Sequence, residues 1–500
     1  MKKIFVFLIL ILTALCSSYG QSRQDTKSYK NPSLSVDKKP LNVLFIAVDD
    51  LRPEMGCYGN TILKTPNMDK LASTGTIFDR AYCQQAICMA SRASIMSGML
   101  PENNLIFKCG PVNDAYPKQK MLDDMFKDSG YEIKVYGKIY HHKSDAVKQY
   151  GQKWINSDPN SQEKGRGYLD PLSISRIFDK EGRGLAYESP DVADNEYFDG
   201  YQAEKAAETL DDFSKSGKPF FLAVGFYKPH LPFNAPKKYW DMYSEDDIKL
   251  ATNQYLPKNY TKNTKFNFEE LRNYAGIPKG DTLLSTPLQR NLIHGYYASV
   301  SYTDANIGKL LNKLKETGLD KNTVVVLWGD HGWKLGEHGM WGKHTNFELD
   351  AHVPLIIRAP GFQNGRAKSF VELLDLYPTL AELCQLKHPE NLQGKSLVTE
   401  LKAPSKQIHN EAYGMYPHFQ NNNSKLVIGY TVVDERYRYI NWIHIETGQS
   451  QGKELYDHTN DPGENINVAD AEKNKEVVDR MDSLLHKRFK MNASILEYKK

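Results

Sequence analysis

A cysteine stands immediately before a stretch of small and apolar residues that favours a helix, in the run from Cys88 to Gly98. At a helix N-terminus a cysteine lies at the positive end of the helix dipole and beside free backbone N–H groups, which is a suitable seat for an anion. Arg92, one helical turn further on, adds a planar cation that suits a tetrahedral oxyanion such as sulfate or phosphate. A buried cysteine in a turn of small residues is the alternative, and these residues alone leave both interpretations open.

Two adjacent acids, Asp49 and Asp50, follow a continuous apolar segment at 41–48. Such a segment is typical of a central parallel strand that is buried on both faces. Ligand sites of open parallel sheets lie beyond the carboxyl ends of the strands, so both acids are well placed for chemistry. A turn or a helix cap would explain one buried carboxylate, but two adjacent ones are costly without a cation.

Polar side chains also follow three other apolar segments, at 131–136, 219–226 and 323–328. They are Lys138, His141, His230, Asp330 and His331. If these segments are parallel neighbours of 41–48, their polar residues converge with Cys88 on one edge of the sheet. Three carboxylates and a neutral imidazole suit a divalent cation, and a mainly oxygen donor set favours Ca²⁺ or Mg²⁺ over zinc. His141 and His230, each taken singly, would be interpreted as structural, but beside the acids they indicate a site.

The strands alternate with segments that favour helices, at 121–130, 203–214 and 292–314, and another strand is expected at 353–358. This alternation predicts an α/β fold with a three-layer, mostly parallel sheet. Long polar stretches at 144–197 and 244–289 are expected to be insertions that build a substrate site or a lid.

Beyond about residue 395 the pattern changes to antiparallel strands, which we expect at 426–431 and 437–445. Residues 454–457 are expected in the following turn, and a last helix at 471–489. The predicted organisation is therefore a catalytic domain at 40–395 and a smaller C-terminal α+β subdomain, with a small antiparallel sheet and a helix, at 396–500.

The N-terminus has the pattern of an export signal. Lys2 and Lys3 precede an apolar segment at 4–15 that is too short to span a bilayer. We predict a signal peptide at 1–20 and a disordered leader at 21–39, hence an exported protein, periplasmic or secreted, that is not inserted in a membrane after cleavage. Cys16 raises the alternative of a lipoprotein anchor, which the sequence favours less because Leu15 is a poor residue before a lipidated cysteine.

The charge balance and the cysteines restrict the function further. The 500 residues carry a formal net charge of only +3, so nothing indicates nucleic-acid binding, and a polyanionic substrate would need a local basic site. After the signal peptide the cysteines are odd in number and widely spaced, so the fold is not expected to depend on disulfides. They are Cys57, Cys83, Cys88, Cys109 and Cys384.

The run Cys88-Met89-Ala90-Ser91-Arg92, with the Ser-Gly that ends at Gly98, resembles the signature of the type I sulfatases. In that family the cysteine is oxidised to formylglycine (3-oxoalanine), the catalytic nucleophile. Further segments that resemble the family lie at 42–53, 56–59, 228–230, 330–339 and 437–439. The resemblance covers about residues 40–470 and is closest to the iduronate-2-sulfatase branch and its bacterial relatives. It implies an alkaline-phosphatase-like fold.

The resemblance also implies the site. Its metal ligands for Ca²⁺, or Mg²⁺, would be Asp49, Asp50, Asp330, His331 and the formylglycine at Cys88. The residues around the sulfate would be Arg92, Lys138, His141, His230 and Lys343. Arg92, Lys138 and Lys343 would hold the sulfate oxygens. His230 would bind the substrate and protonate the leaving sugar oxygen, with Lys343 as the alternative acid, and His141 would take a proton from the formylglycine hydrate to regenerate the aldehyde.

By the same resemblance the substrate would be a sulfated polysaccharide or oligosaccharide, attacked from a chain end at a 2-O-sulfated uronic acid of a glycosaminoglycan. Algal sulfated glycans (carrageenan or ulvan) are an alternative substrate class. A phosphatase or phosphonate hydrolase of the same superfamily, or an inactive glycan-binding homologue, are alternative functions. Sugar contacts are predicted for Tyr413, His418 and Arg436.

One residue departs from the most common family pattern. Ala90 stands where many members have proline, a variant that the family tolerates. The sequence therefore leaves open whether a formylglycine-generating enzyme or an anaerobic sulfatase-maturating enzyme oxidises Cys88.

Overall fold

The computed structural model describes residues 39–104, 111–116, 118–142, 145, 167–177, 183–264, 269–280, 282–420 and 425–492. The predicted signal peptide at 1–20, the predicted leader up to residue 38, Cys16 and Cys109 lie outside the described residues. Residues from Pro40 onward belong to one compact unit. Within the described ranges, no helix is both long enough and apolar enough to cross a membrane.

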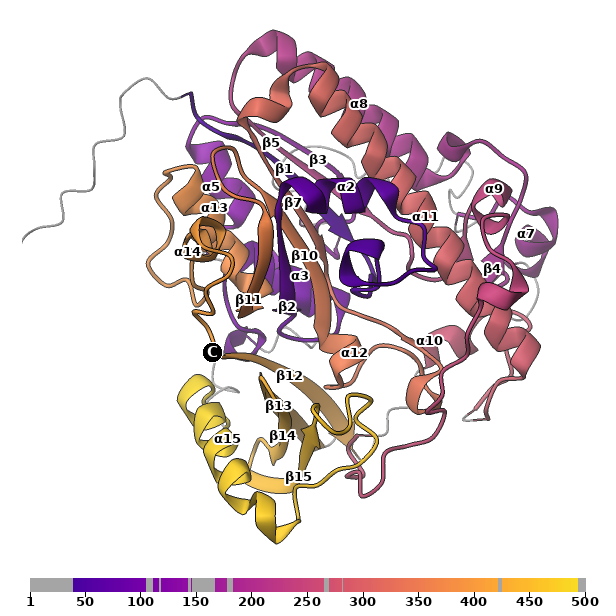
Figure 1. Cartoon of the computed structure of the whole chain (residues 1–500), viewed down its shortest axis with the longest axis vertical. Helices are drawn as coiled ribbons and strands as arrows, with labels where there is room; N and C mark the ends of the chain where they lie inside the picture. The colour runs from indigo at the N-terminus through magenta and orange to yellow at the C-terminus, as the bar shows by residue number, and fades with distance from the viewer. Residues whose placement is uncertain are drawn as a thin grey trace, which may run out of the picture. The chain divides into compact units, whose positions relative to one another are not determined.

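A seven-stranded sheet in the order β11-β2-β10-β7-β1-β5-β3 forms the centre of this unit (Figure 1). Its strands are β1 (Asn42–Val48), β2 (Thr76–Tyr82), β3 (Glu132–Gly137), β5 (Phe220–Phe226), β7 (Thr323–Gly329), β10 (His352–Arg358) and β11 (Gly365–Glu372). β1 pairs in parallel with β5 and with β7, so Val43 lies between Phe221 and Val324. In this sheet β10 alone runs antiparallel to its neighbours. The prediction of a mostly parallel sheet is confirmed.

The two faces of β1 belong to separate hydrophobic clusters, because successive side chains of a strand point to opposite sides of the sheet. Phe45 belongs to the cluster that is covered by α3 (Cys88–Ser97), α5 (Leu122–Asp128) and α13 (Leu376–Leu383). Ile46 belongs to the cluster that is covered by α2 (Pro66–Thr74), α8 (Phe198–Ser216) and α11 (Thr286–Glu316). Helices on both faces of one sheet confirm the predicted three-layer α/β fold.

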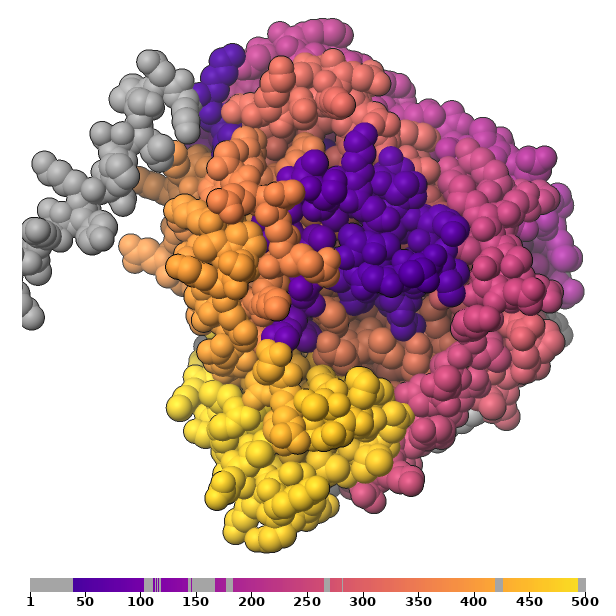
Figure 2. Space-filling view, in the orientation of Figure 1, coloured from indigo at the N-terminus to yellow at the C-terminus, as the bar shows by residue number. Residues whose placement is uncertain are grey.

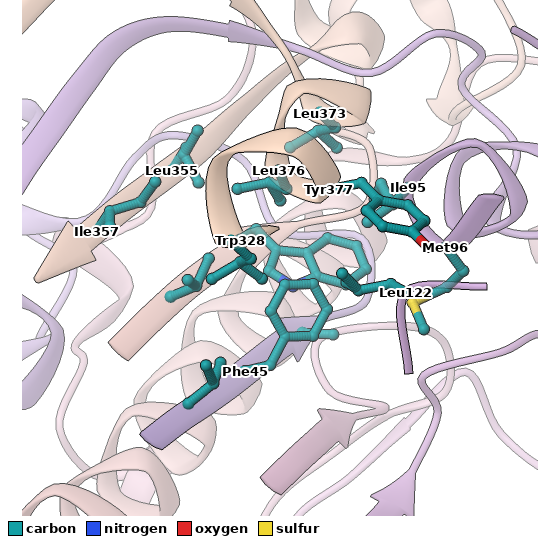
Figure 3. Packing of buried hydrophobic residues seen from close by; sticks show 14 of the residues in the cluster. Phe45, Ile95, Met96, Leu122, Trp328, Leu355, Ile357, Leu373, Leu376 and Tyr377 are labelled. Atoms are coloured by element: carbon teal, nitrogen blue, oxygen red, sulfur yellow. The ribbon is translucent and has the colours of Figure 1, made fainter. Parts of the chain in front are cut away.

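The first cluster fixes α3, the helix that begins at Cys88. Figure 3 shows Ile95 and Met96 of α3 close to Tyr377 of α13, with Trp328 of β7 in the same cluster. All ten residues of α3 are buried, so the helix is held on every side. Since protein interiors are close-packed, a helix held in this way places its first residue with little freedom.

Two strands of the main sheet, β2 and β11, were not predicted from the sequence. Both carry charged residues within the strand, which hides the apolar pattern of a buried strand. The charges pair across the two strands, where the Arg366 guanidinium of β11 binds the Asp79 carboxylate of β2. Such cross-strand ion pairs stabilise a sheet that local hydrophobicity does not reveal.

The C-terminal part contains a four-stranded antiparallel sheet of β12 (Glu411–Gln420), β13 (Lys425–Asp434), β14 (Tyr437–His444) and β15 (Gln449–Asp457). The helix α15 (Lys475–Arg488) packs on it. The prediction of a turn at 454–457 is wrong, because these residues belong to β15. The sequence does not reveal this strand, because β15 begins with polar residues and contains the buried Glu454. Glu454 accepts a hydrogen bond from Thr261 Oγ1 at 2.6 Å. The division at 395/396 stays a prediction.

The two predicted insertions contain short elements and irregular segments. The short strands and α-helices among the described residues, some of them outside the insertions, are β4 (Tyr187–Glu188), β6 (Phe233–Asn234), β8 (Lys334–Leu335), β9 (Trp341–Gly342), α4 (Val112–Ala115), α7 (Pro171–Ile177), α9 (Lys237–Trp240), α10 (Glu269–Arg272), α12 (Glu348–Ala351) and α14 (Val398–Lys402). The second insertion lies against the C-terminal residues, where the Lys258 N–H donates to the Asn465 carbonyl at 2.8 Å (Figure 2). This insertion therefore connects the small sheet to the main one.

A buried ion cluster also joins the small sheet to the main sheet. Arg438 of β14 is 1% exposed. Its Nε lies 2.9 Å from Glu464 Oε1, and its Nη2 binds Glu348 of α12, which leads into β10. The two carboxylates offset the charge of the buried guanidinium, so each partner depends on the others.

Replacing Arg438 by alanine is expected to lower the free energy of unfolding by about 3–5 kcal/mol, because the buried Glu464 and the half-buried Glu348 lose the cation that they share. Urea denaturation measures the change. Arg436→Ala is the matched control, since this arginine pairs with Asp457 at the surface and its side chain is 50% exposed. We expect the control to cost less than about 1 kcal/mol. Equal losses in both variants would contradict the structural role of Arg438.

Candidate functional site

The carboxyl ends of four parallel strands meet at one edge of the sheet and bring the predicted residues together. Asp49 and Asp50 follow β1, and Asp330 and His331 follow β7. The segments after β5 and β3 add His230 and Lys138 to the same edge. Cys88 reaches this edge at the N-terminus of α3, whose first turn has no side-chain cap.

The Cys88 sulfur is in direct contact with two cationic side chains. Its Sγ lies 3.1 Å from His331 Nε2 and 3.3 Å from Lys343 Nζ, and the residue is 4% exposed. Burial and the Asp49 carboxylate raise the pKa of the Cys88 thiol, but Lys138, Lys343 and His331 outweigh them and leave the pKa below its usual value. The position therefore stabilises negative charge on whatever group residue 88 carries.

The three acids are fully buried and paired with specific cations. Asp49 Oδ2 lies 2.5 Å from Lys138 Nζ, and Asp330 Oδ2 lies 2.8 Å from Arg92 Nε. Asp50 Oδ1 lies 2.7 Å from Lys343 Nζ and 3.3 Å from His331 Nδ1. The remaining oxygen of Asp330, Oδ1, accepts the Asp50 backbone N–H at 3.1 Å, which ties the two strand ends together.

These surroundings move the pKa values of the acids in opposite directions. Burial raises the pKa of Asp49, but Lys138, His230 and Arg92 outweigh it and hold the pKa well below its usual range. For Asp50, burial prevails over Lys343 and His230 and raises the pKa to about 6. Burial lowers the pKa of His331, but Asp330 and the Cys88 sulfur outweigh it and raise the pKa to about 10.

The donor set fits a divalent cation. One donor atom from each of Asp49, Cys88, Asp330 and His331 lies within 4.8 Å of the others. The buried Oδ2 of Asp50 has no hydrogen-bond partner among the described residues, and a buried carboxylate oxygen without a partner is costly unless a cation takes it. Carboxylate oxygens are the ligands that Ca²⁺ and Mg²⁺ prefer, so these residues fit the cation that the sequence predicts.

The family of the chain follows from two family models that match it. The model of the sulfatase family matches residues 41–386, which is most of the chain. The chain belongs to the sulfatase family. A second model, described as the C-terminal part of N-sulphoglucosamine sulphohydrolase, matches residues 336–491. The predicted family and the predicted enzyme class, a sulfuric ester hydrolase, are confirmed.

This sulfatase is similar over most of its length to characterised proteins. It is 28% identical to the iduronate 2-sulfatase of Homo sapiens, over 88% of this chain and 90% of that protein. It is 30% identical to a sulfatase of Formosa agariphila, over 96% and 91% of the two chains. The solved phosphonate monoester hydrolase of Silicibacter pomeroyi superposes with a TM-score of 0.70 at 22% identity, covering 89% of this chain and 94% of that one. That likeness shows the fold alone.

The guanidinium of Arg92 in this sulfatase is bound by protein groups. This group is fully buried, binds Asp330 through Nε, reaches Asp49 at 3.5 Å through Nη2 and donates to the Lys138 carbonyl through Nη1. All three guanidinium nitrogens thus have protein partners. In this arrangement Arg92 orients the carboxylates of Asp49 and Asp330. A direct contact with sulfate stays a prediction.

His230 is held by the loop after β5 and by a buried acid of α8. Asp199 accepts the backbone N–H groups of Tyr227 and Lys228 at 3.1 and 2.8 Å. His230 Nδ1 lies 2.7 Å from the Leu231 carbonyl oxygen. Sequence reasoning missed Asp199, because it lies four residues before the helix predicted at 203–214, whereas the observed α8 begins at Phe198.

Sequence reasoning also missed Glu270 of α10. Its Oε1 lies 3.2 Å from His230 Nε2, and its Oε2 lies 4.0 Å from Lys343 Nζ. An acid within the second polar insertion carries no signal that distinguishes it from the other acids there.

The remaining predicted residues lie at the exposed side of the site or away from it. The His141 side chain is exposed and has Lys138 and Asp49 as electrostatic partners. Tyr413 packs against Phe489, and Arg436 pairs with Asp457. The structure therefore adds no sugar-binding argument for Tyr413 or Arg436, and their role stays a prediction, as does that of His418.

Divalent cation affinity is expected to rise with pH between about 5 and 8, by about tenfold per unit while one proton is displaced. The raised pKa values of Asp50 and His331 mean that protons occupy the cation's donor atoms at low pH, so acid weakens binding. Calorimetric titration of the cysteine form with CaCl₂ measures it. Asp246→Asn, at an exposed acid, is the control, and Asp330→Asn should abolish binding. An affinity independent of pH would contradict this assignment.

Proposed function

We propose that this sulfatase hydrolyses the sulfate ester of a sulfated glycan, acting from a chain end on a 2-O-sulfated uronic acid of a glycosaminoglycan. The observation that carries the activity is Cys88 at the uncapped N-terminus of α3, in contact with His331 and Lys343 and beside the buried acids. The similarity to human iduronate 2-sulfatase over 90% of that protein supports the substrate class. The algal glycans remain the alternative substrate class.

In the proposed site Cys88 is matured to formylglycine, and the ligands of a Ca²⁺ or Mg²⁺ ion are Asp49, Asp50, Asp330, His331 and the matured residue 88. When present, the hydrated aldehyde supplies the nucleophile for sulfur, and the cation supplies positive charge for the sulfate oxygens. Lys138, which pairs with Asp49, and Lys343, which pairs with Asp50, also bind sulfate oxygens in this proposal. Arg92 keeps Asp49 and Asp330 in place.

The leaving sugar oxygen is proposed to receive its proton from His230. Around Cys88, the acids and Arg92 are fully buried, whereas the His230 side chain is 20% exposed. The bulk of a sugar therefore fits on the side of His230, with Lys343 as the alternative acid. His141, which is exposed, is proposed to accept the proton that leaves residue 88 as sulfate departs.

The proposal also covers the export and the maturation of the protein. We propose export through the segment at 1–20 and maturation by a formylglycine-generating or an anaerobic sulfatase-maturating enzyme. A phosphonate hydrolase shares the fold, so the fold does not select the substrate. A binding protein with an unoxidised Cys88 is the other alternative, and the mass of residue 88 distinguishes it.

Peptide mass spectrometry across Cys88, on protein from a host that matures sulfatases, is expected to show a loss of about 18 Da, the change from thiol to aldehyde. The same protein should hydrolyse 4-nitrophenyl sulfate, and Cys88→Ala should be inactive, because no nucleophile remains. Cys57→Ala is the control and should keep both the mass change at residue 88 and the activity. Complete maturation without any sulfate release would contradict the proposed function.

Replacing His230 by alanine is expected to lower kcat/KM on a sulfated sugar by about 10²–10⁴-fold, since an alkoxide leaving group needs a proton. On 4-nitrophenyl sulfate, whose leaving group is a stable anion, the loss should be much smaller. Steady-state kinetics on both substrates measure the difference, with His388→Ala at an exposed position as the control. Equal losses on both substrates would assign His230 a role other than that of the acid.

A further inference from the structure

Glu270 is a carboxylate placed among the cations of a site that binds an anion. It lies 3.2 Å from His230 Nε2 and 4.0 Å from Lys343 Nζ, and α10 carries it in from the second insertion. Its side chain is 21% exposed, close to the 20% of His230, while Lys343 is 3% exposed. Glu270 therefore faces the open side of the site, where the proposed leaving group lies.

The charge of Glu270 is well defined. Burial raises the pKa of this carboxyl, but His230, Lys343 and His344 outweigh it and lower the pKa to about 2. The group is therefore an anion, which accepts hydrogen bonds and cannot donate them. An anion here disfavours the sulfate itself, and its oxygens can accept a hydrogen bond from a neutral donor of the substrate.

The next step rests on the proposed function, in which His230 Nε2 donates to the leaving oxygen of the ester. Glu270 Oε1 is one hydrogen-bond length from that nitrogen. On a sugar ring, the oxygen on the adjacent carbon is also about one hydrogen-bond length from the ester oxygen. The substituent next to the ester thus comes within reach of Glu270.

We propose that Glu270 determines specificity by accepting a hydrogen bond from a free hydroxyl adjacent to the sulfate ester. A substrate without that donor covers the half-buried carboxylate and gives it no hydrogen bond in place of the water that it loses, and a second sulfate at that carbon is repelled by it. The preferred substrate class is therefore a sugar monosulfated within a vicinal pair of oxygens. The insertion, rather than the strand ends, carries this selection.

Two aryl esters that differ by one methyl group on the donor oxygen test the proposal: 2-hydroxyphenyl sulfate, whose hydroxyl stays protonated at neutral pH, and 2-methoxyphenyl sulfate. The ratio of their kcat/KM values is compared between the native enzyme and Glu270→Ala, so intrinsic reactivity and general damage to the site cancel. We expect the preference for the hydroxyl ester to fall by about ten- to a hundredfold in Glu270→Ala, as for a hydrogen bond to a charged acceptor. An unchanged ratio would overturn the proposal.

Glu270→Gln separates charge from hydrogen bonding. Its amide oxygen still accepts the hydroxyl, so the preference should be largely retained, while relative activity on the vicinal disulfate of the same ring should rise. Glu245→Gln is the matched control, an exposed acid of the same insertion, and should change neither ratio. A fall in the disulfate activity of Glu270→Gln would contradict the repulsion.

Binding to the unmatured Cys88 protein gives a readout independent of turnover. Calorimetry should show tighter binding of the hydroxyl ester than of the methoxy ester, and Glu270→Ala should remove the difference. If the matured enzyme hydrolyses neither ester, the proposed function fails, while the binding ratio still decides the role of Glu270. Equal affinities for both esters in the native chain would overturn that role.

Discussion

The structure depends on the compensation of buried negative charge. Asp49, Asp50 and Asp330 are fully buried at the ends of β1 and β7, and unpaired carboxylates in such a place would be prohibitively costly. Arg92, Lys138, Lys343 and His331 provide the compensating charges from separate parts of the chain. Each of these contacts is therefore also a tertiary constraint, which fixes α3 and the segments after β3 and β9 against the strand ends.

The charges of this cluster nearly cancel without a metal ion. The cations Arg92, Lys138, Lys343 and His331 match the carboxylates one for one, because Glu270 joins the three acids. An anionic ester then needs positive charge beyond that of the side chains. A divalent cation held by Asp49, Asp50, Asp330 and His331 would supply it, and the N-terminus of α3 adds a partial charge. The raised pKa of His331 reflects the same surroundings, since Asp330 and the Cys88 sulfur favour positive charge at this position.

The elements that sequence reasoning predicted are those whose local pattern is sufficient. β1, β5 and β7 are buried on both faces and carry continuous apolar runs, so their strand ends and the acids that follow could be placed on one edge. β2 and β11 were missed because their charges are satisfied across strands, and β15 because its polar residues bind the second insertion. A polar side chain whose partner is distant in the sequence leaves no periodic pattern from which its strand can be predicted.

The same reason explains which site residues could be predicted. Asp330 follows an apolar strand and could be found from the pattern, whereas Lys343 follows only the short β9 and was expected from the family resemblance alone. The position of Arg92 could be predicted but not its partners, since the choice between acids and substrate depends on the depth of α3 in the core. Glu270 had no signal, because its proximity to His230 arises only when the insertion folds back over the site.

The site thus combines two parts that are held in different ways. The strand ends and α3 are buried and held by ion pairs, which suits a reaction centre whose geometry must not change from one substrate to another. Glu270 belongs to a short helix within an irregular insertion and lies within 4.0 Å of His230 and Lys343. Because Asp49, Asp50 and Asp330 form their ion pairs with residues other than Glu270, a substitution at Glu270 can change substrate preference and leave those pairs in place. This arrangement of charges therefore permits the insertion to determine substrate preference while the strand ends and α3 stay unchanged.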